Sequence, residues 1–170
     1  VHEAVHSWFQ LLLATNESKY AWMDEGFTNY AQGEVMAEMF PPNLNPHAAA
    51  YSAYSNFTLS GLEEPMTTHA DHYNSNKAYG IGSYTKGSLT IPQLSYIIGK
   101  EKMEVGMKRY YNEWKFKHPT PTDFKRVMEK VSGLELDWFF EYWVETTKSI
   151  DYSIKAVNEK GNKTQVILEK

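Results

Sequence analysis

Residues 1–9, Val-His-Glu-Ala-Val-His-Ser-Trp-Phe, contain the pattern H-E-x-x-H. This pattern requires the rest of the chain to supply polar partners for the two histidines. On an α-helix, residues four apart lie on one face, so His2 and His6 can direct both imidazoles to one point while Glu3 projects beside them. Apolar neighbours predict that this helix is buried: Val1, Ala4, Val5, Trp8, Phe9 and residues 11–13. Buried imidazoles and carboxylates require partners, which a shared metal ion would supply. The alternative is a helix whose histidines are only hydrogen-bonded within a core.

Glu25 follows the second histidine after a gap of eighteen residues, inside the stretch W-M-D-E-G-F at 22–27. Two histidines and a glutamate leave the fourth tetrahedral position of a zinc ion to water, which is the arrangement of catalytic rather than structural sites. In the H-E-x-x-H pattern the glutamate is the general base. The sequence therefore predicts one zinc ion per chain, bound by His2, His6 and Glu25, with Glu3 as the catalytic base.

The pattern of apolar residues predicts a mainly α-helical chain. Helical spacing indicates helices over residues 1–14, 22–40, 45–60, 79–98, 103–114, 121–132 and 136–143. Pro41-Pro42 should end the second of these helices, and Thr120 to Asp123 has the form of a capping box with proline at the first helical position. After Ile150 the pattern changes to two short alternating segments, 152–157 and 164–168, around Lys160-Gly161-Asn162, which predicts a β-hairpin.

Composition restricts the class of protein. A chain of 170 residues with 42% hydrophobic and 15% aromatic residues has enough apolar surface for a packed core. The net charge of -4 argues against a nucleic-acid partner, and no apolar run approaches the length of a membrane span. Because there is no cysteine, a disulfide framework and a thiolate metal site are both excluded. The chain begins one residue before a candidate ligand, so we expect it to be a piece of a longer protein.

Further motifs accompany the candidate ligands. The zinc helix continues as H-x-W-F at residues 6–9, residues 22–27 are a form of W-L-x-E-G-F, Y-x-K-G stands at 84–87, T-x-x-D-F at 120–124 and L-D-W-F-F-x-x-W at 136–143. With the ligand spacing, these motifs resemble the gluzincin aminopeptidases, the family of aminopeptidase N and leukotriene hydrolase. The resemblance covers most of residues 1–150.

This resemblance implies a fold, a reaction and further site residues. Residues 1–149 would form the helical half of a thermolysin-like catalytic domain, and residues 150–170 would begin a following β domain. The family's upstream β-sheet lobe, its N-terminal domain and its G-x-M-E-N motif, whose glutamate holds the substrate's free amino group, do not occur in this sequence. Tyr84 of the Y-x-K-G motif would be the catalytic tyrosine, although spacing alone favours core packing for it.

Four residues near the ligands are candidates for supporting roles. Asp24, Asn29 and Gln32 compete to orient a ligating imidazole, and Gln32 stands where some family members carry a second glutamate. Tyr79 is a candidate substrate-facing residue, with core packing as the alternative. A second metal site from His69, Asp71 and His72 is possible by composition, but an ordinary polar loop is the favoured interpretation because the three residues form no known motif.

The leading hypothesis is a fragment of a zinc aminopeptidase whose parent protein removes N-terminal residues from peptides by zinc-activated water attack. The rivals are a zinc endopeptidase with the same ligands and a non-catalytic helical interaction module. We expect weak or absent activity in the isolated chain and a metal site that is incompletely filled, because His2 lies in the first, fraying turn of its helix. Without the upstream domains, an exposed apolar surface would make dimerisation plausible.

Overall fold

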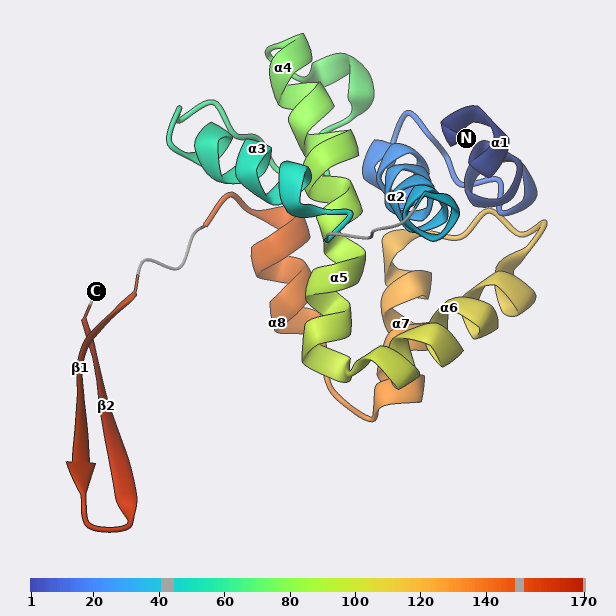
Figure 1. Ribbon diagram of the computed structural model, residues 1–170. Coiled ribbons are helices and arrows are strands. Elements are labelled where there is room, and N and C mark those ends of the chain that lie inside the picture. Colours follow the sequence, from blue (N-terminus) through green and yellow to red (C-terminus); the bar gives the residue numbers. More distant parts are fainter. Residues whose placement is uncertain (41–44, 149–151, 170) are drawn as a thin grey trace.

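The structure is a computed structural model that describes residues 1–40, 45–148 and 152–169, and it is a helical body with one β-hairpin at the C-terminal end (Figure 1). The helical elements in chain order are α1 (His2–His6), η1 (Ser7–Leu12), η2 (Trp22–Gly26), α2 (Phe27–Met39), α3 (Ala48–Thr58), η3 (Ala70–His72), α4 (Asn76–Tyr79), η4 (Gly80–Lys86), α5 (Gly87–Ile98), α6 (Lys100–Trp114), α7 (Pro121–Ser132), α8 (Asp137–Phe140) and η5 (Glu141–Glu145). The segment η3 is a 3-10 turn, and the other η segments are π-helical. Each π-helical segment continues directly into or out of an α-helix, so the predicted helices are confirmed as long helical runs.

Helix ends follow the chemistry that the sequence predicts. The backbone N–H of Thr120 donates to Asp123 Oδ2 at 2.9 Å, which completes the capping box at the start of α7. The same helix ends at Gly133, whose φ of 73° is left-handed and favours glycine. The predicted stop of the second helix at Pro41-Pro42 lies outside the described residues.

One apolar core holds the helices together. Trp22, Phe27, Tyr110 and Phe124 lie at its centre and are fully or almost fully buried. The ring of Phe27 packs against those of Trp22 at 5.6 Å and Phe124 at 4.9 Å, so the start of α2 is fixed to α7. This core lies directly behind the residues that form the candidate site.

The prediction that apolar residues bury the first helix on all sides is wrong. Val5 and Leu13 face the core, but Trp8 and Leu11 are 50% and 66% exposed. The reason is position: the helix lies at the edge of the helical body and packs through one face only (Figure 1). Val35 lies at a helical spacing that would place it on the buried side of the second helical run, but it is also exposed.

The helical run that ends in α5 passes through the middle of the molecule and crosses the run that carries Glu25 (Figure 1). Two glycines meet at this crossing. A Cβ atom added to Gly26 would lie 2.6 Å from the carbonyl carbon of Gly87, and one added to Gly87 would lie 3.0 Å from the Cα of Gly26. The absence of side chains at these positions therefore sets how closely the two runs approach.

We expect Gly26→Ala to destabilise the protein. The added methyl group meets backbone atoms of Gly87, which cannot rotate away, and overpacking of this kind costs about 1–3 kcal/mol or more. That cost exceeds the gain of about 1 kcal/mol from replacing a helical glycine by alanine. The matched control is Gly80→Ala, where the space around the added atom is open, so only the helix-propensity gain remains. Denaturant unfolding measures both; equal stabilisation by the two variants would contradict the crossing argument.

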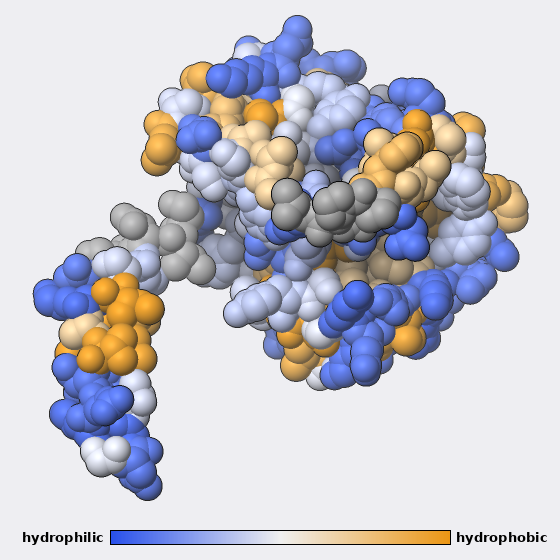
Figure 2. All heavy atoms as spheres, in the orientation of Figure 1, coloured by the Kyte–Doolittle hydropathy of each residue, from blue (hydrophilic) through white to orange (hydrophobic). Residues whose placement is uncertain are grey.

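The C-terminal hairpin pairs β1 (Ser153–Lys160) with β2 (Lys163–Glu169) in antiparallel register around Gly161, whose φ is 61°. The predicted hairpin is confirmed and is longer than the sequence pattern indicated. Almost every residue of both strands is exposed, and the exposed apolar residues include Ile154, Val166 and Leu168. Figure 2 shows apolar side chains gathered at one end of the hairpin. The domain boundary predicted at 149/150 lies outside the described residues. In the ranges that the structure describes, no helix is both long and apolar enough to cross a membrane.

Candidate metal centre

The two histidines of the first helix and Glu25 of η2 converge on one point. Glu25 Oε2 lies 3.1 Å from His2 Nε2 and 3.3 Å from His6 Nε2, and the two Nε2 atoms are 3.2 Å apart. One ligand atom from each of the three side chains thus lies within 4.8 Å of the other two. Among the described residues this is the single group of three or more histidine or carboxylate side chains with such spacing.

Local packing explains why these side chains meet. His2 and His6 are one helical turn apart, so their rings share a face and meet edge to face at 4.8 Å between centroids. The ring of Phe9 packs on Phe27 at 5.9 Å and joins the first helical run to the second. Because Glu25 lies two residues before Phe27, this contact directs the second run against the imidazoles.

The remaining ring nitrogens have oxygen partners. His2 Nδ1 lies 3.0 Å from Gln32 Oε1, and His6 Nδ1 lies 2.8 Å from Asp24 Oδ1 and 3.3 Å from Thr28 Oγ1. Amide and carboxylate oxygens accept hydrogen bonds, so the neutral tautomer with its proton on Nδ1 suits these contacts in both rings and leaves the lone pair on Nε2. Two such lone pairs and a carboxylate oxygen in one place are stabilised by a cation. The donor set fits zinc, whose histidine ligands usually donate their other N–H to an oxygen in this way.

Two ionisable groups beside the converging side chains have raised pKa values. Burial, reinforced by the neighbouring Glu25 and opposed by His6, raises the pKa of Asp24 to about 6. Burial and a hydrogen bond to the Glu25 carboxylate raise the pKa of Tyr84 above its ordinary value. Burial is the larger cause of both shifts, and the carboxylate of Glu25 adds to each of them.

Tyr84 reaches the same point from η4. Its ring stacks on that of His2 at 5.9 Å with an interplanar angle of 19°, and Tyr79 packs edge-on against it at 6.1 Å. Asn29 is hydrogen-bonded to another segment: its Nδ2 donates to the Tyr84 carbonyl oxygen at 3.4 Å. Glu3 is on the exposed side of the first helix. Tyr84 and Tyr79 thus lie beside the converging side chains. Of the three candidate orienting residues, Gln32 contacts His2, Asp24 contacts His6 and Asn29 contacts the backbone of Tyr84.

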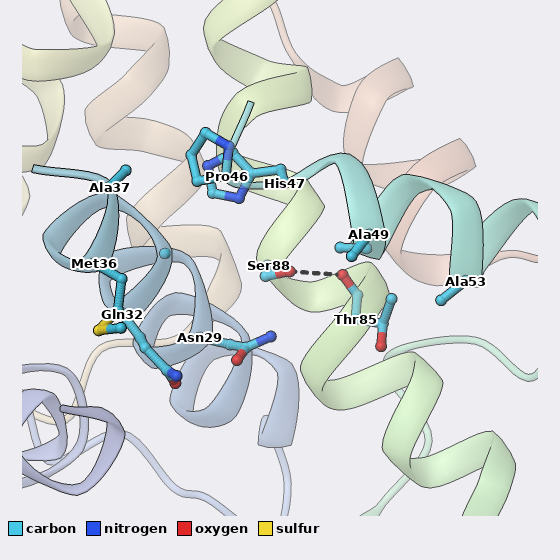
Figure 3. A pocket seen from close by; sticks show the side chains of 12 residues that line it. Asn29, Gln32, Met36, Ala37, Pro46, His47, Ala49, Ala53, Thr85 and Ser88 are labelled. Atoms are coloured by element: carbon cyan, nitrogen blue, oxygen red, sulfur yellow. Dashed lines mark hydrogen bonds between the residues drawn. The ribbon is translucent and has the colours of Figure 1, made fainter. Parts of the chain in front are cut away.

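A cavity of about 560 Å³ opens beside the ligands between α2, α3 and the run of η4 and α5 (Figure 3). Asn29 and Gln32 line it on the α2 side, opposite Ala49 and Ala53 of α3. Gln32 therefore touches both the cavity and His2. The lining residues are mostly small, so the space is open to an extended ligand.

Other polar residues lie outside the group of three converging side chains. His69 and Asp71 are 3.8 Å apart and the rings of His69 and His72 lie at 4.9 Å, but these three do not form a metal-spaced group among the described residues. Thr28, beside the His6 ring, was not singled out because a threonine within a helix gives no sequence signal of its own.

Comparison with known proteins gives three consistent findings. The sequence profile described as "Peptidase family M1 domain" matches residues 1–143. "Probable aminopeptidase 1" of Sulfurisphaera tokodaii is 24% identical over 172 residues, and human "Aminopeptidase B" is 26% identical over 163 residues. These alignments cover 96% and 87% of this chain, but 21% and 22% of the two relatives, so the chain spans about a fifth of their length.

Solved structures share the fold. The crystal structure of a mutant M1 zinc metallopeptidase from Deinococcus radiodurans, bound to a Tyr-Ser-Ala substrate, superposes with a TM-score of 0.71 at 17% identity. The superposition covers 88% of this chain and 33% of that protein. The helical body therefore has the architecture of part of such a peptidase.

Proposed function

The chain belongs to peptidase family M1, and from this premise we propose that it carries the zinc centre of an aminopeptidase that removes N-terminal residues from peptides. The observation that carries the proposal is the convergence of His2, His6 and Glu25 on one point, with their other polar atoms held by neighbouring side chains. Family membership alone does not require that these three side chains be in place. Their convergence supports a catalytic metal site rather than a helical module that has lost its catalytic residues.

His2, His6 and Glu25 would hold the metal, which when bound lowers the pKa of a water molecule and polarises the scissile carbonyl. Glu3, beside them on the first helix, accepts a proton from the water and later delivers it to the leaving amine. The Tyr84 hydroxyl donates a hydrogen bond to the oxygen on which negative charge develops. Asp24 and Gln32 keep both imidazoles in the tautomer that leaves Nε2 free.

The cavity beside Gln32 provides space for the peptide. At about 560 Å³ it falls in the size range of small-ligand sites, and its lining, which is mostly small but includes Gln32, Met36 and His47, leaves room for more than one kind of side chain. We infer that part of the substrate lies there while the scissile bond lies at the converged ligands.

We further propose that the chain is part of a longer protein. Its curated relatives are about five times as long, and no glutamate in a G-x-M-E-N motif is present here to hold the substrate's amino group. The isolated chain should therefore hydrolyse peptides weakly or not at all. His2 is in the first turn of α1, which has no side-chain cap, so zinc retention should be weak as well. One tightly bound zinc per isolated chain after dialysis would contradict this part.

The test uses the parent protein with two matched substrates, an aminoacyl anilide and the same compound with an acetylated amino group. We expect hydrolysis of the free-amino substrate alone, loss of activity with a chelator and recovery with zinc. Hydrolysis of the blocked substrate would instead identify an endopeptidase. Zinc retention without hydrolysis of either substrate would favour a non-catalytic module.

A further inference from the structure

Lys86 is a charged side chain inside the helical body, and the reaction proposed above does not use it. It is 1% exposed, which is unusual for lysine because burial removes the ammonium group from water. Burial lowers the pKa of Lys86, and the carboxylate of Glu63 opposes that effect. Because burying the Lys86 ammonium is energetically unfavourable, its burial points to a role of this side chain beyond packing.

The contacts of Lys86 come from three separate segments. Its Nζ donates to Glu63 Oε1 at 2.7 Å in the loop after α3. The hydroxyl of Tyr54, on α3, donates to the same oxygen at 2.9 Å. The ammonium also lies over the rings of Tyr54 and Trp143, at 5.4 Å and 5.5 Å from their centroids. Lys86 therefore fastens η4 to α3, to the loop and to η5.

Two further hydrogen bonds connect Trp143 to the helical turn that carries Lys86. Trp143 Nε1 donates to Thr90 Oγ1 at 3.1 Å, and that hydroxyl donates to the Lys86 carbonyl oxygen at 3.4 Å. The ring of Trp143, which lies over the Lys86 ammonium, is thus hydrogen-bonded to the same helical run that carries Lys86. The next residue, Gly87, makes the backbone contact with Gly26.

This arrangement fixes the rotation of η4 about its axis. Tyr84 and Lys86 are two residues apart, so their side chains leave the helix on nearly opposite sides. Apolar contacts tolerate small rotations and shifts, whereas a buried ammonium with one carboxylate partner does not, because any movement leaves a charge unpaired. Holding Lys86 on Glu63 therefore holds the Tyr84 ring against His2 on the other side.

We infer that Lys86, through Glu63, is a positioning residue for Tyr84. The inference rests on the role proposed for Tyr84. Buried ion pairs are often replaced by apolar side chains without loss of stability, which agrees with a pair that specifies geometry more than it stabilises the fold.

The test is a double-mutant cycle in the parent protein. The first arm replaces both partners, Lys86→Met with Glu63→Met, so that no buried charge is left unpaired. We expect the melting temperature and the zinc content to be retained, KM to change less than about threefold, and kcat to fall about tenfold to hundredfold, as for a group displaced by a fraction of an ångström. The second arm repeats the pair in a Tyr84→Phe background, where no further fall in kcat is expected.

The matched control is Lys77→Met, the same substitution at an exposed position of the same helical run, which should leave kcat unchanged. If the paired replacement does not fold, Tyr54→Phe removes one bond to Glu63 and takes its place in the cycle, with a smaller loss of the same sign. Unchanged kcat, or an equal fall in both backgrounds, would overturn the inference.

A structural measurement separates this inference from the proposed function. Crystal structures of the paired variant should show the Tyr84 ring displaced from its stacked position on His2, whether or not the protein is a peptidase. A ring that stays in place would overturn the positioning role. A wild-type parent that hydrolyses neither test substrate refutes the proposed function alone.

Discussion

Glu3→Gln is expected to abolish peptide hydrolysis in the parent protein while one zinc ion per chain remains bound. Glutamine keeps the size of the side chain but cannot accept the proton of the attacking water, and general base catalysis contributes about 10²–10⁴-fold to a rate. Glu3 lies on the exposed side of the first helix and is not one of the three side chains whose ligand atoms converge, so its replacement should not disturb them. Metal analysis and kcat on the same sample measure the two properties.

Glu25→Ala should give the opposite pattern. Its carboxylate lies 3.1 Å and 3.3 Å from the two imidazole nitrogens, so the substitution removes one of three metal ligands and the zinc content falls with the activity. Glu38→Gln is the control, because it makes the same change as Glu3→Gln at an exposed position of α2. If Glu3→Gln lost the metal and Glu25→Ala kept it, the assignment of base and ligand would have to be exchanged.

The convergence of His2, His6 and Glu25 could be predicted because the position of each of these residues depends on sequence close to it. His2 and His6 share a helix face whatever the rest of the fold does, and the motif around Glu25 places that residue at the start of a second helix. The hairpin and the capping box of α7 were predictable for the same reason, since both depend on residues close in sequence. Local rules thus account for the elements and for the identity of the three converging residues.

Contacts between distant segments could not be predicted. The sequence named Asp24, Asn29 and Gln32 as competitors for the imidazoles, but the division between them depends on how the helices pack: Asp24 contacts His6, Gln32 contacts His2, and Asn29 contacts the backbone of Tyr84. The pair of Lys86 and Glu63 was missed because a loop of unpredictable course brings them together. Hydropathy likewise could not show that one face of the first helix is exposed, because an apolar residue does not reveal what covers it.

Tyr84→Phe is expected to lower kcat in the parent by about 10²–10³-fold, with KM and zinc content little changed. The substitution removes one hydroxyl and keeps the ring, which stacks on His2 and packs against Tyr79. Loss of one preorganised donor to a developing oxyanion costs about 2.7–4 kcal/mol of barrier, and the effect falls on kcat because the bond is made mainly in the transition state.

Tyr96→Phe makes the same change on α5 at a position that is 90% exposed, so it should leave kcat, KM and stability unaltered. The comparison also decides between the two interpretations of Tyr84. If Tyr84 were a core residue, Tyr84→Phe would lower the melting temperature and leave kcat nearly unchanged, because its hydroxyl would not contact the substrate. A catalytic tyrosine would show the reverse, a normal melting temperature and a rate reduced by two orders of magnitude or more. The ring of Tyr84 stacks on that of His2 at 5.9 Å, beside the converging side chains, and this position favours the second result.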